Sequence, residues 1–167
     1  AGPIAPDRLG PTLMHEHLLW DIAPPSLKQA AGNDPGPPIT LENHWKYSYG
    51  EISHLRKYQL HDVAVAIDEV ARMQQDGGRA IVELSCGGLR PDPRGLRDIQ
   101  LATGVQVVMG CGYYVEEYQD PRNHGRTVDD FAQEMVGQVL DGAWGTDVKA
   151  GIIGEIGCQS PWTELER

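Results

Sequence analysis

The sequence lacks an excess of positive charge, a long apolar run and a dense set of cysteines. Its 14 lysine and arginine residues are outnumbered by 24 aspartate and glutamate residues, for a formal net charge of −10. Because nucleic-acid binding depends on clustered basic side chains, we predict no nucleic-acid partner. No stretch approaches the roughly 20 consecutive apolar residues of a membrane-spanning helix, so we also predict no membrane partner.

The cysteines Cys86, Cys111 and Cys158 are too few for a disulfide framework, and their number is odd. We expect free thiols in a reducing compartment, and, because the first ten residues contain no apolar signal-peptide core, a cytoplasmic location. All three lie near the ends of strand-like segments, so a thiolate metal site is an alternative. Small buried thiols are the favoured interpretation.

Four short apolar segments alternate with three segments of helical periodicity. The predicted strands are residues 10–19, 79–85, 105–109 and 149–157, and the predicted helices are residues 61–76, 92–102 and 128–141. Strands that are apolar on both faces are typical of a parallel sheet covered by helices. This order fits either an open doubly wound sheet or the first four units of a (β/α)8 TIM-type barrel, and periodicity does not decide between them. No dinucleotide-binding glycine motif follows the first strand.

Local signals mark the ends of these segments. Thr127 is a predicted N-cap of the last helix, whose apolar side would include Met135 and Leu140. From Trp20 to Tyr49 the chain is rich in proline, glycine and asparagine, which predicts a long loop inserted after the first strand. Loops of this length in compact domains often bind ligands or act as lids.

Two histidines and one glutamate are the candidate metal ligands. His15 and His17 are two residues apart on a predicted strand, so their side chains point to the same side, as two ligands of one metal ion must. Glu155 is the lone carboxylate in an apolar strand, and a buried carboxylate needs a cation or strong hydrogen bonds. The alternatives are a pair of ordinary polar histidines at a strand end and an ion pair of Glu155 with an arginine such as Arg79.

Four segments of the chain, in order, resemble successive strands of the phosphotriesterase-related branch of the amidohydrolase superfamily. They run from Gly10 to His17, from Gly77 to Ser85, from Val107 to Tyr114 and from Ala150 to Gly157. The resemblance implies a (β/α)8 barrel, of which residues 1–167 would form the N-terminal half of one metal-dependent hydrolase domain. The remaining strands of such a barrel lie outside this sequence.

The resemblance also implies a binuclear centre at the C-terminal mouth of the strands, with two divalent ions, usually Zn²⁺. In this family pattern His15 and His17 bind the more buried ion, and Glu155 stands at the bridging position, where phosphotriesterases proper have a carboxylated lysine. The family's other ligands, two histidines and an aspartate, come from later strands. His44, His54, His61 and His124 match no ligand position, and we expect them at the surface.

The function implied is a zinc-dependent hydrolase in which a metal-bridging water attacks an ester, lactone or phosphoester bond, with Glu155 in the catalytic centre. Tyr114, at the end of the third strand, is a candidate pocket residue for a small-molecule substrate. The first alternative is a small-molecule binding protein on the same barrel with little turnover. The second is a metal-free structural domain, because fold does not determine function. The family pattern and the long loop favour a homodimer.

Overall fold

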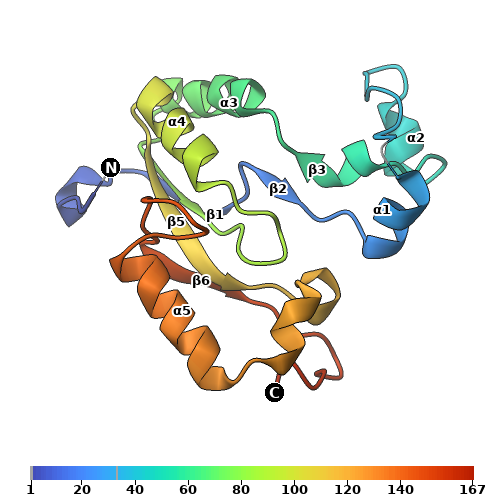
Figure 1. Ribbon diagram of the computed structural model, residues 1–167. Coiled ribbons are helices and arrows are strands. Elements are labelled where there is room, and N and C mark those ends of the chain that lie inside the picture. The colour runs from blue at the N-terminus through green and yellow to red at the C-terminus, as the bar shows by residue number, and fades with distance from the viewer. Residues whose placement is uncertain (1, 33) are drawn as a thin grey trace.

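A four-stranded parallel sheet forms the centre of the computed structural model, which describes residues 2–32 and 34–167 (Figure 1). Its strands are β1 (Thr12–Glu16), β4 (Ala80–Glu83), β5 (Gln106–Tyr113) and β6 (Ile152–Ile156), arranged in the order β1-β4-β5-β6. Each strand pairs in parallel with the strand before it. A doubly wound sheet would reverse its order at a switch point, so this unbroken order is that of a barrel.

Three helices connect these strands, and each begins at a residue that caps it. They are α3 (Val63–Gln75), α4 (Pro93–Thr103) and α5 (Val128–Leu140). The side chain of Asp62 accepts hydrogen bonds from the first turn of α3, and Asp92 does the same for α4. Thr127 and Asp130 form a capping box at α5, which confirms Thr127 as the predicted N-cap. The predicted strand and helix order is therefore confirmed.

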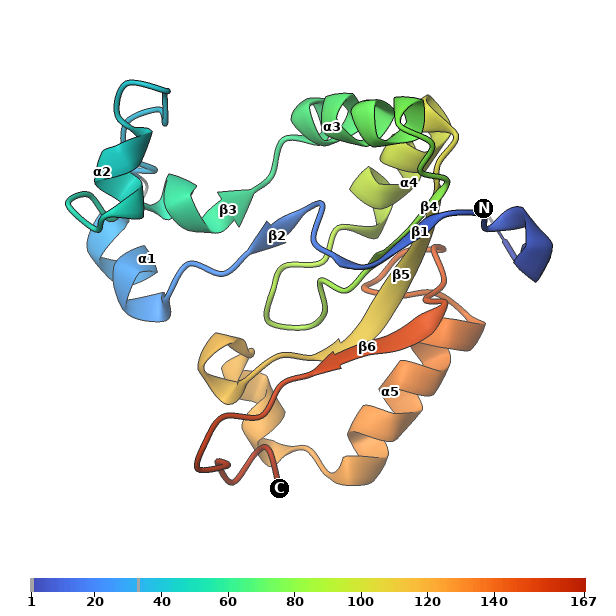
Figure 2. The same cartoon turned by 180° about the vertical axis from the view of Figure 1, so that it is seen from behind.

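The segment between β1 and α3 is more regular than the predicted loop (Figures 1 and 2). It contains α1 (Pro25–Ala31), α2 (His44–Ser48) and an antiparallel pair of short strands, β2 (Trp20–Asp21) and β3 (Gln59–Leu60). Both views show this lobe projecting away from the main sheet. Secondary-structure propensity did not indicate β2 and β3 because each has only two residues and is stabilised by pairing with the other. Asn33 of the predicted loop, like Ala1, lies outside the described residues.

The third strand of the sheet continues past its predicted end at Met109. The sequence suggested that Gly110 begins the loop, but β5 runs to Tyr113 because it is paired on both sides, with β4 and β6. The backbones are close here, since a Cβ atom on Gly110 would lie 3.2 Å from the Cα of Gly154. Short 3-10 helices complete the fold: η1 (Pro6–Arg8), η2 (Leu55–Tyr58), η3 (Glu116–Tyr118) and η4 (Pro121–Gly125).

The core lies between the sheet and helices α3 and α4. Ile81, Ile99 and Val105 are almost fully buried there. The predicted apolar side of α5 is covered only in part: Met135 packs against the core, whereas Leu140 is 61% exposed. The four strands and the other helices therefore cover only part of the apolar side of α5.

The outer strands of the sheet are also uncovered. Met14 on β1 and Ile153 and Ile156 on β6 are more than half exposed. An exposed sheet edge with apolar side chains is a surface that proteins normally pair or cover. The open edges are those of a partial barrel. No helix among the described residues is both long enough and apolar enough to cross a membrane.

One carboxylate is completely buried in this core. Glu83, the last residue of β4, has 0% exposure and accepts hydrogen bonds from Ser85 and from the backbone N–H of Leu18. Burial raises the pKa of Glu83 from 4.5 to about 7, against the lowering effect of these hydrogen bonds. Its ionised form is therefore maintained at a cost in stability.

We predict that Glu83 makes the folded state less stable as the pH rises. Between pH 4.5 and about 7 the folded carboxyl keeps its proton and the unfolded one does not, so the free energy of unfolding falls with rising pH. The loss across this window is on the order of 3 kcal/mol. Urea unfolding at pH 5 and pH 8 in chelator should show a flatter pH dependence for Glu83→Gln. The same substitution at Glu69, exposed on α3, is the control, and equal slopes for Glu83→Gln and the parent would contradict the prediction.

Candidate metal centre

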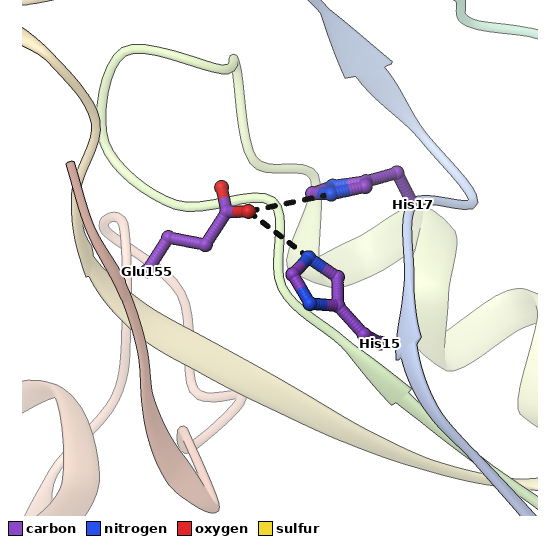
Figure 3. A group of neighbouring side chains, drawn as sticks. All are labelled: His15, His17 and Glu155. Atoms are coloured by element: carbon purple, nitrogen blue, oxygen red, sulfur yellow. Dashed lines mark hydrogen bonds and ion pairs between the residues drawn. The ribbon is translucent and has the colours of Figure 1, made fainter.

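His15, His17 and Glu155 meet at the C-terminal end of the sheet (Figure 3). His15 lies near the end of β1, His17 follows that strand directly, and Glu155 lies on β6. The Nε2 atom of His15 is 3.0 Å from Oε1 of Glu155, and Nε2 of His17 is 3.7 Å from the same oxygen. The structure therefore brings together all three residues that the sequence indicated as ligands.

This contact requires a curved sheet. β1 and β6 are the outer strands, with β4 and β5 between them. At the usual spacing of about 4.8 Å, a flat sheet would hold strands three positions apart about 14 Å from each other, with parallel side chains. The 3.0 Å separation of His15 and Glu155 shows that the two outer strands turn toward each other on the concave face. The three residues lie at the C-terminal mouth, where barrels of this type have their active sites.

The environment of His17 favours a neutral imidazole. Burial lowers the pKa of His17, although the nearby charge of Glu155 acts in the opposite direction. The ring stacks on Trp20, with ring centroids 5.2 Å apart. A neutral imidazole has a free lone pair on one nitrogen, which is the form that binds a metal ion.

The donor set fits a metal ion. The three ligand atoms lie within 4.8 Å of one another, and two imidazoles with a carboxylate are ligands that zinc uses. Oε1 of Glu155 faces both histidines, whereas Oε2 is buried without a hydrogen-bond partner among the described residues. A buried carboxylate oxygen without a partner is costly, and a cation would satisfy it. The alternative prediction, an ion pair between Glu155 and Arg79, was wrong, because Arg79 donates its hydrogen bonds to the backbone carbonyls of Gln74 and Gly78.

Tyr114 lies at the same end of the sheet. It follows β5, is half-buried, and makes an edge contact with Tyr118 at a centroid distance of 5.5 Å. Burial, and then the charge of Glu155, raise the pKa of Tyr114, which places its hydroxyl within the electrostatic reach of the site. The structure is therefore compatible with Tyr114 as a pocket residue.

The other candidates lie apart from this group. Cys86 and Cys111 are buried and Cys158 is exposed, and none joins the metal-ligand group found in the described part of the chain. Burial raises the pKa of Cys86 to about 12, so it remains a thiol. The thiolate site is therefore not formed. Of the remaining histidines, His54 is half-buried and the others are exposed, and none belongs to the group.

One cavity in the described part of the chain lies apart from the candidate ligands. It has a volume of about 710 Å³ and is lined by Tyr113, Arg126 and Trp144 among others, but by none of the three ligands. Two of its arginines are paired with acids: Arg126 with Glu134 at 2.6 Å, and Arg122 with Asp120.

Two further residues contact the site that the sequence did not single out. The hydroxyl oxygen of Ser85 lies 3.1 Å from Nδ1 of His17, and Oε1 of Glu83 lies 2.5 Å from the same hydroxyl oxygen. Glu83 shares the signal that identified Glu155, a lone acid in an apolar strand. Its relation to His17 could not be inferred from sequence because the two residues are on different strands.

Comparison with known proteins agrees with this geometry. The family model that matches is the phosphotriesterase family, over residues 1–167. N-acetyltaurine hydrolase of Rattus norvegicus is 34% identical over 99% of this chain and 48% of its own length. The chain thus spans about half the length of the curated relatives that it matches.

Solved structures also match nearly the whole of this chain with about half of their own length. A resiniferatoxin-binding protein from Rhodobacter sphaeroides is 39% identical, with a TM-score of 0.85, over 99% of this chain and 47% of its own. The phosphotriesterase homology protein from Escherichia coli, complexed with phosphate in its active site, is 28% identical with a TM-score of 0.71, over 96% and 46%. The parallel half-barrel, the cluster at its mouth and the match along the whole chain together establish that this chain belongs to the phosphotriesterase family.

Proposed function

We propose that this chain supplies one side of a binuclear zinc centre in a hydrolase. The observation that carries the proposal is the convergence of His15 and His17 on Oε1 of Glu155. The other carboxylate oxygen, Oε2, is buried and has no partner in the part of the chain that the structure describes. Two imidazoles and one carboxylate form a set of ligands that suits a divalent cation.

Each residue has a distinct role in this proposal. His15 and His17 would hold the more buried ion, and Glu155 would be shared between the two ions. Bound divalent ions activate a water molecule and polarise the carbonyl or phosphoryl oxygen of a substrate. The chain itself orients these ligands, since His15 and His17 are separated by one residue at the end of β1 and Glu155 approaches from β6.

The proposed substrates are small molecules with an ester, lactone or phosphoester bond. The relative named N-acetyltaurine hydrolase adds N-acetyltaurine to the compounds to be tested. Tyr114 is the proposed pocket residue of this half, because it lies at the mouth and its hydroxyl is near the charge of Glu155. A cytoplasmic location and a homodimer stay predictions.

A binding protein on the same barrel is the second candidate. It is favoured by the 39% identity to a protein named for binding resiniferatoxin. The two candidates differ in one measurable property. A hydrolase converts a lactone, ester or N-acetyltaurine panel in the presence of zinc, whereas a binding protein returns its ligands intact.

We predict that the metal depends on the two histidines of β1. The full-length protein, natively purified, should contain about two zinc equivalents per molecule, and His15→Ala/His17→Ala should lose most of them. Elemental analysis after dialysis measures this. The matched control is His44→Ala/His124→Ala, which removes two exposed histidines outside the cluster. Equal zinc content in both double variants, or none in the parent after zinc loading, would refute the assignment.

We predict that Glu155→Gln weakens zinc binding and turnover although the side chain keeps its size. Glutamine keeps the size of the side chain but removes its charge and one acceptor oxygen, so bound zinc should fall and turnover should drop by at least about 100-fold. Zinc content and turnover on the most active substrate are measured together. Unchanged zinc content and turnover would mean that Glu155 does not bridge the ions. Glu164→Gln, near the C-terminus, is the control.

We predict that metal binding stabilises the fold through the same cluster. A ligand that binds only the folded state raises its stability by mass action. Removing metal with a chelator should therefore lower the melting temperature of the parent protein by several degrees. In His15→Ala/His17→Ala the chelator should have little effect. A chelator effect of equal size in both proteins would place the stabilising metal elsewhere.

A further inference from the structure

We infer that Ser85 and Glu83 are positioning residues that fix His17 in the tautomer with its proton on Nδ1, so that Nε2 is free for a metal ion. This inference deepens the proposed function and rests on it. It concerns residues that the family pattern of ligands leaves out. The observation behind it is a continuous chain of contacts from a fully buried carboxylate to one ligand ring.

The chain of contacts is short and shielded from water. Oε1 of Glu83 is 2.5 Å from Oγ of Ser85, and that oxygen is 3.1 Å from Nδ1 of His17. Glu83 is 0% exposed and Ser85 is 1% exposed. Buried polar groups exchange partners rarely, because a broken hydrogen bond leaves an unsatisfied group in the core.

Counting protons gives the direction of these hydrogen bonds. When Glu83 is ionised, as it is for the most part at pH 8, its carboxylate can only accept, so the single hydroxyl proton of Ser85 is donated to Glu83. The Ser85 oxygen then has only lone pairs to offer His17, and Nδ1 of His17 must carry the proton that it donates. The second ring nitrogen, Nε2, therefore has a free lone pair. This nitrogen is the one that faces Glu155, at 3.7 Å from Oε1.

Glu83 also holds the backbone beside His17. Its Oε1 accepts a hydrogen bond from the N–H of Leu18, the residue that follows His17, at 3.3 Å. Its Oε2 accepts from the N–H of Ser85 at 3.2 Å. One carboxylate on β4 thus fixes both the chain after β1 and the hydroxyl that orients the ring.

The two histidines consequently differ in how firmly they are held. His17 is fixed by Ser85 at Nδ1 and by the ring of Trp20, which stacks on it. The His15 side chain is 58% exposed, and in the described part of the chain its ring hydrogen-bonds only through Nε2. Orienting contacts behind a ligand commonly change metal affinity by about 10- to 100-fold. His17 is therefore the ordered ligand, and His15 is the adjustable one.

The tautomer can be tested without metal. In zinc-free protein at pH 8, where Glu83 is largely ionised, nitrogen NMR of labelled histidine should show His17 protonated at Nδ1 and not at Nε2. In Ser85→Ala this preference should be lost, while the signals of His15 stay the same. Thr103→Ala is the matched control, because it also removes a buried hydroxyl, one that bonds to Ile99 and Val105. A proton on Nε2 of His17 in the parent, or an unchanged tautomer in Ser85→Ala, would overturn the inference.

Zinc affinity provides the second measurement. Competition with a chromophoric chelator should show about 10- to 100-fold weaker binding for Ser85→Ala, and a change in the same direction for Glu83→Gln. In a His17→Ala background, Ser85→Ala should have no further effect, because Ser85 acts through His17. An equal loss in both backgrounds would assign Ser85 a purely structural role and overturn the inference. If Ser85→Ala does not fold, Glu83→Gln is tested in the same cycle.

These experiments separate the two levels of the proposal. If the parent protein binds no zinc, the proposed function fails, and the NMR measurement still decides the tautomer. If the parent binds zinc but Ser85→Ala binds it equally well, the proposed function stands and the positioning role is refuted.

Discussion

The curvature of the parallel sheet is the constraint on which the site depends. Adjacent strands follow one another without a reversal, so the first and last strands of this half-barrel are its outer strands, and only the bend of the sheet lets their side chains meet. His15 and Glu155 are 140 positions apart in the chain and 3.0 Å apart in space. Helix α4 packs against β5, and α3 packs against α4. The convergence of strand ends at one mouth is the general reason that such barrels have their active sites there.

Two carboxylates, Glu155 and Glu83, determine the chemistry that is possible at the site, and burying each of them lowers the stability of the fold. Glu155 has an oxygen that is buried without a partner among the described residues, and Glu83 is fully buried with its pKa raised by burial. In residues 2–32 and 34–167 neither carboxylate is paired with a lysine or arginine, so stability alone does not explain them. Buried acids of this kind are often found at functional sites, where a cation or the orientation of a ligand compensates their cost. Glu155 would face the ions directly, whereas Glu83 would act from behind His17.

The relation to known proteins is closest in the arrangement of these strands. The chain matches the phosphotriesterase family along its whole length and covers about half of its curated relatives. The exposed apolar residues on β1, β6 and α5 agree with this coverage, because they form the surfaces on which the rest of such a barrel would pack. Relatives named for hydrolysis and for ligand binding share this scaffold, so activity has to be decided by chemistry at the site.

The sequence by itself determined the order of strands and helices, the N-cap at Thr127 and the three candidate ligands. These features depend on local patterns: periodicity, capping chemistry, and a histidine pair or a lone acid in an apolar strand. Tertiary structure alone decided that β5 extends to Tyr113, because the extension depends on pairing with both neighbouring strands. It also decided the pairing of the short strands β2 and β3, because neither strand is stable alone. It also decided the contact of Ser85 and Glu83 with His17, because hydrogen bonds between strands depend on register and curvature, which no local pattern encodes.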